Sequence, residues 1–398
     1  MFRRWLEEFE QFAIDVILER RYGKRALLLR WFLFALSGLF CRIVQSRLWL
    51  YKNRILQETS PGCLVISIGN LTVGGTGKTP VVEKFARTLQ DNGRKVAILS
   101  RGYKSKKPPI FRRLQRKWLG MERLKSRVVH DGKKLLLDSR FAGDEPFMLA
   151  RSLKDVIVLV DKNRVRAALY AVQDLKCDTL LLDDGMQYLP LKHRLEICLI
   201  DRQAPFGNEY LLPRGTLREP PENLRRASYI FITKSDGSDN QGLVDRIRTY
   251  NRTAEIIECS HQPLYLQNLY TDERHPLEWL SGKYVGALSG IARPESFEEK
   301  LVALGANVEI TKRFADHHRF SERELDDFIA RCVRRDLDCI VTTEKDGVRF
   351  PYKPPSADVP IYFLRVEIEI LTGHESWQSL VNRICKPPAL KPPGRFFA

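Results

Sequence analysis

VISIGNLTVGGTGKTP, residues Val65–Pro80, has the pattern of a buried strand that enters a glycine-rich loop and then opens a helix. Gly74, Gly75 and Gly77 leave the loop backbone free to turn, so that successive N–H groups can point at the oxygens of a phosphate. The N-terminus of the following helix adds a favourable dipole. The stretch predicts a P-loop, with a glycine-rich turn that binds nothing as the alternative.

The end of this loop provides the two side chains that a nucleotide site needs. Lys78 can reach the β- and γ-phosphates, and the Thr79 hydroxyl can bind Mg²⁺. The strict motif has glycine where this chain has Thr72, but the later glycines are all present. We therefore predict nucleotide contacts along Thr72, Gly74, Gly75, Thr76, Gly77, Lys78 and Thr79.

Short apolar runs alternate with stretches of helical length after the N-terminal region. The runs are rich in Val, Ile and Leu without strict alternation, as expected of parallel strands buried on both faces. Strands and helices in alternation form a doubly wound α/β sheet. The expected strands are 63–68, 95–99, 156–160, 179–182, 197–200 and 230–233.

The same pattern restarts after about residue 252 and indicates a second, smaller α/β domain. Its expected strands are 284–288, 308–310, 339–342 and 361–364. Residues 104–129 form a basic insertion between elements of the first sheet. We predict four regions: N-terminal helices over 1–54, a P-loop domain over 55–252, the smaller α/β domain over 253–385 and a proline-rich tail over 386–398.

Paired acids occur twice in the P-loop domain. Asp183 and Asp184 follow an apolar strand, where a P-loop protein holds its metal or the metal's water shell. Asp-Gly also favours plain turns, but beside a P-loop the metal interpretation is the better one. Asp144 and Glu145, in GDEP, precede an expected helix, and capping of that helix by Asp144 is the simpler alternative to a catalytic role.

Two further polar clusters lie in expected loops. LLPRGTLREP contains Arg214 and Arg218, whose guanidinium groups can bind phosphate through two hydrogen bonds. FADHH, in the second domain, places His317 and His318 after Asp316. A single histidine is usually structural, whereas two beside an acid favour catalysis or metal binding.

Most of the chain's net charge of +17 lies in two segments. Residues 24–54 hold seven Lys/Arg and no acid, and residues 104–129 hold ten Lys/Arg and one acid. Such local basicity faces a polyanion, either nucleic acid or an anionic lipid surface. Residues 26–40 are apolar but contain Arg30, and the run is short for a bilayer span. A basic amphipathic helix in the membrane interface fits better than a buried core helix.

The eight cysteines form no C-x-x-C pair, so neither a zinc site nor a redox motif is indicated. Several lie within apolar strand-like runs, where a thiol behaves as a small apolar group. We expect reduced, buried cysteines in a cytoplasmic protein.

The ordered set of motifs resembles the tetraacyldisaccharide 4'-kinases. The resemblance runs from about residue 67 to 347 and rests on TVGGTGKTP, SRGYK, GDEP, DDGMQ, LLPRGTLREP, FADHH and TTEKDG. It implies a peripheral enzyme at the cytoplasmic face of the inner membrane, which uses ATP and Mg²⁺ to phosphorylate the 4'-hydroxyl of tetraacyldisaccharide 1-phosphate and so forms lipid IVA. The chain departs from the family pattern at Met186, where a bulky aromatic is usual, and at Tyr188, where histidine is frequent.

The resemblance also implies the catalytic residues. Asp144 is the expected base for the acceptor hydroxyl, and His317 is its expected partner from across the domain cleft. His317 is preferred to His318 because it directly follows the acid in the family's Asp-His pattern. Tyr103 is expected to pack near the nucleotide or the acceptor.

The remaining matched residues are expected around the phosphates. Glu145 is placed near Mg²⁺, where Asp183 and Asp184 complete the metal environment. Arg218 and Glu219 are expected to contact the γ-phosphate or the transition state, because phosphoryl transfer depends mainly on positioning and charge neutralisation.

Two other functional classes remain open at this point. TKSD, at 233–236, follows an expected strand and resembles the guanine motif of GTPases, so another P-loop ATPase or GTPase is one alternative. A basic nucleic-acid-binding protein is the other, although it leaves the P-loop and the acid clusters unexplained. We expect an anionic membrane surface and a lipid substrate as partners, no nucleic acid, and no obligate protein partner.

Overall fold

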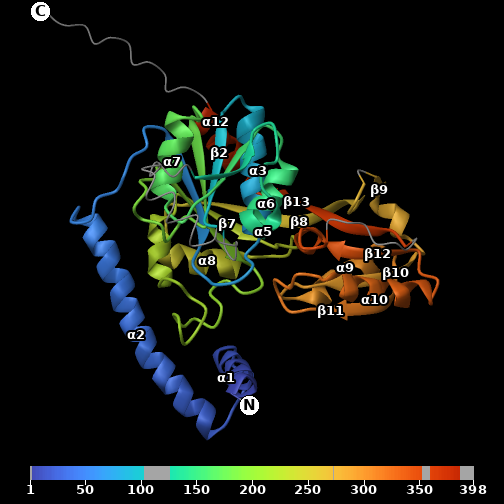
Figure 1. Cartoon of the computed structure of the whole chain (residues 1–398). Coiled ribbons are helices and arrows are strands. Elements are labelled where there is room, and N and C mark those ends of the chain that lie inside the picture. The colour runs from blue at the N-terminus through green and yellow to red at the C-terminus, as the bar shows by residue number, and fades with distance from the viewer. Residues whose placement is uncertain (1, 103–125, 272, 352–358, 386–398) are drawn as a thin grey trace, which may run out of the picture.

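A single mixed sheet runs through the part of the chain that the computed structural model describes, residues 2–102, 126–271, 273–351 and 359–385 (Figure 1). Its first strands are β1 (Leu64–Asn70), β2 (Val96–Ser100), β3 (Arg127–Asp131), β4 (Ile157–Val160), β5 (Thr179–Asp183), β6 (Leu195–Asp201) and β7 (Tyr229–Thr233). The others are β8 (Glu255–Asn268), β9 (Arg274–Pro276), β10 (Tyr284–Ser289), β11 (Asn307–Arg313), β12 (Cys339–Thr343) and β13 (Ile361–Thr372). The order is β11-β10-β12-β13-β8-β7-β6-β1-β5-β2-β4-β3, and β9 pairs with β8.

The first lobe has helices on both faces of its strands. One face is covered by α3 (Lys78–Asp91), α6 (Asp144–Ser152) and α12 (His374–Cys385). The other face is covered by α7 (Arg164–Gln173) and α8 (Gln241–Tyr250). Strand β1 lies in the middle and pairs in parallel with β5 and β6. The predicted doubly wound α/β fold is therefore confirmed, and the continuous apolar runs are strands buried on both faces.

The second lobe repeats this three-layer plan on a smaller scale. Strands β10, β11 and β12 are parallel, and β12 pairs in parallel with the start of β13. Helix α9 (Pro294–Ala303) and the short helix η2 (Leu277–Leu280) pack on one face, and α10 (Glu322–Val333) packs on the other. The predicted second α/β unit is confirmed.

Two long strands join the lobes. The start of β8 pairs in parallel with β7, and the rest of β8 pairs antiparallel with β13. Because β13 leads the chain back toward the first lobe, the helix that follows it packs there, with the Trp377 ring 4.6 Å from that of Phe85. The sequence assigned residues 253–385 to the second domain; in the structure α12 lies in the core of the first lobe.

Some elements differ from the sequence-based expectation. Strand β3 begins at Arg127, within the segment expected to be an insertion, and pairs antiparallel with β4 at the sheet edge. Only Val129 and His130 of its five residues are buried, as in an edge strand rather than in a buried parallel one. Most of the basic insertion, Tyr103 and the proline-rich tail lie outside the described residues. The remaining short helices are α5 (Ser139–Ala142), η1 (Pro221–Arg226) and α11 (Glu344–Gly347).

Two helices precede the sheet, α1 (Phe2–Ile17) and α2 (Lys24–Lys52), as the N-terminal sequence predicts. Helix α2 has 29 residues and, within the described part of the chain, is the helix long and apolar enough by composition to cross a membrane. Few of its residues are buried, and large apolar side chains such as Leu28, Trp31 and Phe32 are exposed. Its midpoint contacts the first lobe, because Ser37 Oγ donates to the Leu211 carbonyl at 2.8 Å.

Candidate active site

The P-loop joins β1 to α3 and ends in a helix start that has no side-chain cap. Gly77 is the N-cap residue, with φ of 76°, and no side chain bonds to the first-turn amides of α3. A Cβ at Gly77 would also lie 2.5 Å from the His261 ring, so only glycine fits here. The free amides at this helix N-terminus form an anion site of the kind that binds phosphate.

The Thr-Lys-Ser-Asp segment after β7 forms hydrogen bonds with the backbone of this loop. Thr233 Oγ1 donates to the Thr76 carbonyl at 2.8 Å, and Lys234 Nζ donates to the Gly75 carbonyl at 2.6 Å. Lys234 is also paired with Asp201 at 2.5 Å. Thr76 Oγ1 is buried and has no hydrogen-bond partner. The segment therefore holds the loop backbone in place.

Asp236, the acid of that segment, is paired with residues outside the P-loop. Asp236 accepts from Arg202 Nη1 at 2.9 Å and from the Ser238 amide at 3.0 Å. A guanine-reading acid presents its carboxylate to the base, whereas this carboxylate is paired with an arginine. Support of the P-loop explains TKSD without guanine recognition.

A second loop, which contains Leu217 and Arg218, pairs with the start of the P-loop. Thr72 forms an antiparallel bridge with Leu217, and the Arg218 amide donates to the Leu71 carbonyl at 2.7 Å. This pairing fixes the backbone of Arg218 beside the start of the P-loop. Arg214, the other arginine of the same motif, is instead buried and paired with Glu19 at 2.7 Å, so it links the lobe to the N-terminal helices.

Asp184 is contacted by both cationic side chains of the P-loop site, Arg218 and Lys78. Arg218 Nη1 donates to both of its oxygens, at 2.7 and 2.9 Å, and Lys78 Nζ lies 3.6 Å from Oδ1. Lys78 also donates to Asn70 Oδ1 at 3.2 Å. Burial raises the pKa of Asp184, but Lys78 and Arg218 outweigh it and hold the pKa below its ordinary value. The structure therefore brings Lys78, Asp184 and Arg218 together, and their roles toward phosphate and metal stay predictions.

Asp183, at the end of β5, is in the opposite electrostatic situation. Its side chain is buried and accepts a hydrogen bond from Ser100 Oγ at 2.9 Å. Burial and the negative charges of Glu145 and Asp184 raise the pKa of Asp183 to about 7. Within the described residues no cation forms an ion pair with Asp183, and the charge of Lys78 only partly opposes the rise in its pKa.

The donors around Asp183 fit Mg²⁺. Mg²⁺ in nucleotide sites is held by one or two carboxylates together with phosphates and water, and a cation would relieve the repulsion that raises the pKa of Asp183. Thr79, in the first turn of α3, has a hydroxyl of the kind that P-loop proteins use for the same ion. No group of three His, Cys, Asp or Glu side chains is arranged for a metal in the described residues, so an all-protein metal cage is not found there.

Glu219 is buried in a network of protein donors. It accepts from Asn223 Nδ2 at 2.7 Å, from Arg226 Nη2 at 2.8 Å and from Gln187 Nε2 at 3.1 Å. Gln187 also donates to the Asn70 carbonyl at 3.1 Å. Glu219 thus fixes Gln187 beside the P-loop, and its expected phosphate contact stays a prediction. Gln187 lies inside the quoted motif DDGMQ, but no role was predicted for it.

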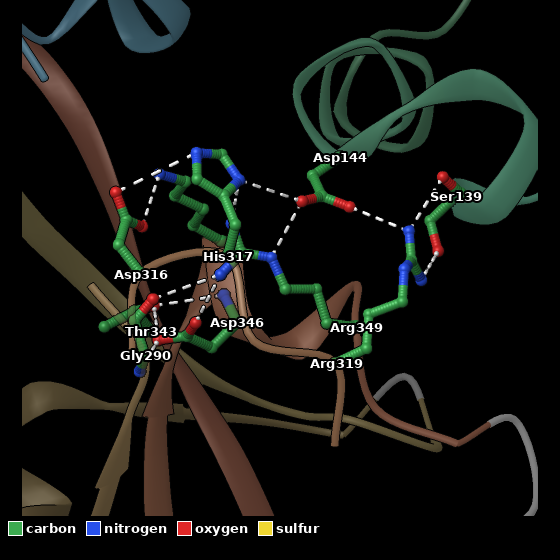
Figure 2. Close-up of polar contacts among 10 residues, drawn as sticks. Ser139, Asp144, Gly290, Asp316, His317, Arg319, Thr343, Asp346 and Arg349 are labelled. Atoms are coloured by element: carbon green, nitrogen blue, oxygen red, sulfur yellow. Dashed lines mark hydrogen bonds and ion pairs between the residues drawn. The ribbon is translucent and has the colours of Figure 1, made fainter. Parts of the chain in front are cut away.

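A second polar centre lies where the lobes meet (Figure 2). The N-cap of α6 is Gly143, without a side-chain cap bond, so Asp144 does not cap the helix. Its carboxylate instead points across to the second lobe, where Oδ2 lies 3.3 Å from His317 Nδ1. The structure brings the two predicted catalytic residues together although 173 positions separate them.

Two arginines that the sequence did not reveal complete this centre. Arg349 Nε donates to Asp144 Oδ2 at 2.8 Å, and Arg319 Nη2 donates to Asp144 Oδ1 at 3.0 Å. Arg349 is fully buried, and Arg319 also bonds to Ser139. Burial raises the pKa of Asp144, but the hydrogen bond with His317 and the charges of Arg349 and Arg319 hold it below its ordinary value.

Arg349 contacts His317 as well. Its Nη2 lies 3.0 Å from His317 Nδ1, and its Nη1 donates to Asp346 Oδ1 at 2.9 Å and to the Gly290 carbonyl at 3.2 Å. A ring nitrogen holds either a proton or a lone pair, so Nδ1 can donate to Asp144 or accept from Arg349 but not both. His317 has φ of 68°, a conformation rare for a residue with a Cβ and found at functional sites.

The neighbouring histidine faces a different environment. The His318 ring stacks on Phe314 with centroids 4.5 Å apart, and its Nε2 lies 3.1 Å from Glu324 Oε2. Glu324 belongs to the capping box of α10. His318 therefore supports the second lobe, in keeping with the choice of His317 for the site.

The two centres are connected through α6. Asp144 and Glu145 are adjacent in its first turn, so one residue faces His317 and the next is close enough to influence Asp183. Acceptor chemistry at Asp144 and metal chemistry at Asp183 can thus take place close together at the first turn of α6. These features are those of a P-loop phosphotransferase: a doubly wound fold, a P-loop, and the adjacent acids Asp144 and Glu145 that connect the two centres.

Comparison with known proteins gives the family. The family model described as tetraacyldisaccharide-1-P 4'-kinase matches residues 29–386, and the chain belongs to this family. A tetraacyldisaccharide 4'-kinase of Anaeromyxobacter dehalogenans (strain 2CP-C) is 41% identical, over 81% of this chain and 82% of that protein. One from Halothermothrix orenii is 32% identical, over 95% and 98%. The structure of LpxK from Aquifex aeolicus in complex with ATP matches with a TM-score of 0.70 at 27% identity, over 90% of this chain and 100% of that one.

Proposed function

We propose that this protein transfers the γ-phosphate of ATP to the 4'-hydroxyl of tetraacyldisaccharide 1-phosphate, forming lipid IVA in lipid A biosynthesis. Family membership over residues 29–386 supports the substrate class, and the likeness to an ATP-bound LpxK supports the nucleotide. The observation that carries the proposal is the arrangement of two sites: Lys78 contacts Asp184 at the P-loop, and Asp144 of the same lobe contacts His317 of the second lobe.

The P-loop site binds and neutralises the triphosphate. The amides of the loop and of the first turn of α3 bind phosphate oxygens, and Lys78 and Arg218 compensate charge on the group being transferred. Mg²⁺, held by Thr79, Asp183 and Asp184 with Glu145 nearby, would supply further charge compensation on the phosphates. Arg218 then exchanges part of its contact with Asp184 for phosphate.

Asp144 is placed to accept the proton of the acceptor hydroxyl. Its low pKa keeps it ionised at neutral pH, so it is always able to accept that proton. The proton is transferred as the hydroxyl becomes acidic on approach to phosphorus, and a weak base suffices for a loose transition state. His317 orients the carboxylate from the second lobe, so the pair forms only when the lobes meet.

A direct phosphate-transfer assay tests the proposal. The purified protein is incubated with ATP, Mg²⁺ and tetraacyldisaccharide 1-phosphate in detergent, and the phosphorylated lipid is measured. Wild type should turn over, whereas Lys78→Ala should lose activity by orders of magnitude and keep its fold. Lys162→Ala, at an exposed lysine of the same lobe, is the matched control and should behave as wild type. Absence of turnover by wild type, or full activity of Lys78→Ala, would contradict the proposal.

We further propose that the protein is peripheral on the cytoplasmic face of the inner membrane. Ser37, at the middle of α2, bonds to Leu211 and to the Arg214 amide, both in the catalytic lobe. A spanning helix has its midpoint in the hydrocarbon core, where a polar lobe cannot follow. The helix therefore lies in the interface, with exposed apolar side chains in the lipid and its arginines at anionic headgroups.

Fractionation tests this arrangement. Alkaline carbonate should release the protein from membranes, and high salt should release part of it. The triple variant Leu28→Ser, Trp31→Ser, Phe32→Ser changes exposed positions only and should move the protein toward the soluble fraction. Wild type that stays with the membranes in alkaline carbonate would indicate that the protein spans the bilayer. A triple variant that still pellets with the membranes would indicate attachment through another surface.

A further inference from the structure

Arg365, in β13, is a buried arginine where the two lobes join, and the proposed mechanism does not use it. Only 3% of the residue is exposed. Its Nη1 donates to Glu344 Oε1 at 2.7 Å and to Ser152 Oγ at 3.1 Å, and its Nη2 donates to Glu83 Oε1. Glu83 lies in α3, Ser152 is the last residue of α6, and Glu344 is the first residue of α11. One guanidinium therefore contacts helices of both lobes.

The two first-lobe helices that Arg365 contacts are those that carry the proposed chemistry. Helix α3 begins at Lys78 of the P-loop, and α6 begins at Asp144. Ser152 Oγ also donates to Glu344 Oε1 at 3.2 Å, so the end of α6 is joined to α11 directly as well as through the arginine. Because a short helix moves as a unit, a contact along either helix helps to fix the residue at its start.

On the side of the second lobe, α11 leads to the acceptor site. This helix is the EKDG of the motif TTEKDG. Lys345 Nζ donates at 3.2 Å to Asp316, the neighbour of His317, and Asp346 accepts from Arg349 Nη1 at 2.9 Å (Figure 2). Both His317 and Arg349 contact the proposed base. Helix α11 thus holds the two second-lobe segments that face this base.

We propose that Arg365 and Glu344 are positioning residues: they fix the P-loop helix α3 relative to α11, and so set the geometry between the nucleotide and His317. The inference rests on the proposed function, because it concerns the geometry of that reaction. A misplacement of about 1 Å can lower turnover about 100-fold, even when the altered residue lies far from the reacting groups. Burial raises the pKa of Glu344 and the charge of Arg365 acts against this, so the glutamate depends on the arginine for its charge.

The simpler alternative is that this charge cluster only stabilises the fold. Buried ion pairs can often be replaced by apolar groups without loss of stability, so burial alone assigns no role. The two interpretations differ in what a substitution changes. A positioning role lowers kcat through His317, whereas a purely structural role adds independently to the effect of other substitutions.

Steady-state kinetics separate the two interpretations. Glu344→Gln keeps the shape of the side chain and removes its charge. With ATP, Mg²⁺ and tetraacyldisaccharide 1-phosphate, its kcat should fall about 10- to 100-fold with little change in KM for ATP. In combination with His317→Ala it should cost little more than His317→Ala alone, since a positioning residue acts through the group that it places.

Two further variants complete the kinetic test. Arg365→Lys keeps a buried cation but not the fork that bridges two glutamates, so it should lose kcat in the same way, and it carries the test if Glu344→Gln folds poorly. Glu369→Gln, at an exposed acid of the same strand, is the control and should behave as wild type. Unfolding temperatures of all variants show that they are folded under the assay conditions.

Hydrogen exchange tests the same contacts without turnover. In Glu344→Gln the amides of residues 315–319 should exchange several times faster than in wild type, whereas those of β10 and α10 should be unchanged. The inference is overturned if the losses of Glu344→Gln and His317→Ala multiply, or if Arg365→Lys keeps the kcat of wild type. It is also overturned if exchange at 315–319 is unchanged or rises equally throughout the second lobe. Exchange needs no acceptor, so it decides the inference even if wild type does not phosphorylate the lipid.

Discussion

Asp183 and Asp144 are two carboxylates near the first turn of α6, and their electrostatic environments are opposite. Asp183 is buried next to Glu145 and Asp184, and its pKa rises to about 7. Asp144 receives hydrogen bonds from Arg349 and Arg319 and contacts His317, and its pKa falls below its ordinary value. At Asp183 the nearby charge of Lys78 does not offset burial and the neighbouring acids, whereas at Asp144 the surrounding cations outweigh burial.

The difference indicates which parts of the reaction the protein supplies by itself. Around Asp144 the cations are side chains, so that site is complete once the lobes meet. Around Asp183 the charge of Lys78 leaves the acids under-compensated, so further positive charge has to arrive with the nucleotide, as Mg²⁺ does in P-loop proteins. Binding of nucleotide and closure of the lobes are then two separate conditions for turnover.

The largest expected effect comes from breaking the Asp144 centre. Asp144→Ala and His317→Ala should each lower kcat by about 10²- to 10⁴-fold with little change in KM for ATP, because the pair acts on the acceptor. The double variant should lose little more than the worse single variant, since residues that act as a unit are not additive. His318→Ala is the control and should retain near-normal kcat. Independent, multiplying losses would show that Asp144 and His317 do not form a pair.

An intermediate effect is expected from Arg349→Gln, which makes the Asp144 site resemble that of Asp183. Removing the buried charge should raise the pKa of Asp144, so the acid limb of kcat/KM should move to higher pH. The lowered pKa also affects stability. A carboxylate with a depressed pKa stabilises the folded protein at pH values above its pKa in the unfolded state. This stabilisation is lost as the pH falls through its pKa in the native state. The variant should therefore lose stability at neutral pH and show a weaker decline in acid.

Arg334→Gln, at an exposed arginine of the same lobe, is the control for charge. An unchanged acid limb in Arg349→Gln would mean that His317 and Arg319 set the pKa of Asp144 without Arg349. The kinetic importance of Arg349 would then be limited to holding the lobes together.

The smallest expected effect is a change in thermal stability on substitution of Asp183, the expected Mg²⁺ ligand. A raised carboxyl pKa means that stability is greatest below the ordinary value near 4 and is lost as pH rises through about 7. Asp183→Asn should remove that loss, so the metal-free variant should melt a few degrees above wild type at pH 8 and equally at pH 4. Mg²⁺ with nucleotide should stabilise wild type more than the variant. A variant less stable than wild type at pH 8 would indicate that Asp183 already has a cation.

The sequence was sufficient for the parts of the site that lie in local motifs. The P-loop, the acids after β5 and the Asp144–His317 pair follow from short patterns whose chemistry is readable without a structure, and the last also needed the family resemblance. Arg349 follows the quoted TTEKDG by two positions, yet nothing local distinguishes it from a surface arginine. Its contact with Asp144 spans 205 positions, and only the fold creates it.

Burial and pairing decide the remaining differences. Arg164 and Arg166 are equivalent in a sequence pattern, but within the described residues Arg166 forms an ion pair with Asp161, whereas the Arg164 guanidinium stacks on Tyr188. Glu219 is an ordinary polar residue in its motif, whereas in the structure it anchors Gln187 and Arg226. The return of α12 to the first lobe depends on the length of β13, which the short apolar run 361–364 did not reveal.

The position of α12 also has a consequence for how the protein is made. Leu380 and Ile384 lie in the same core as Val82 and Phe85 of α3, the helix that follows the P-loop. On the ribosome this core stays open until nearly the whole chain has emerged, so the nucleotide site matures late and after the second lobe has its strands. A nascent chain released before residue 374 lacks this helix, and its nucleotide-binding lobe exposes an apolar face to chaperones and proteases.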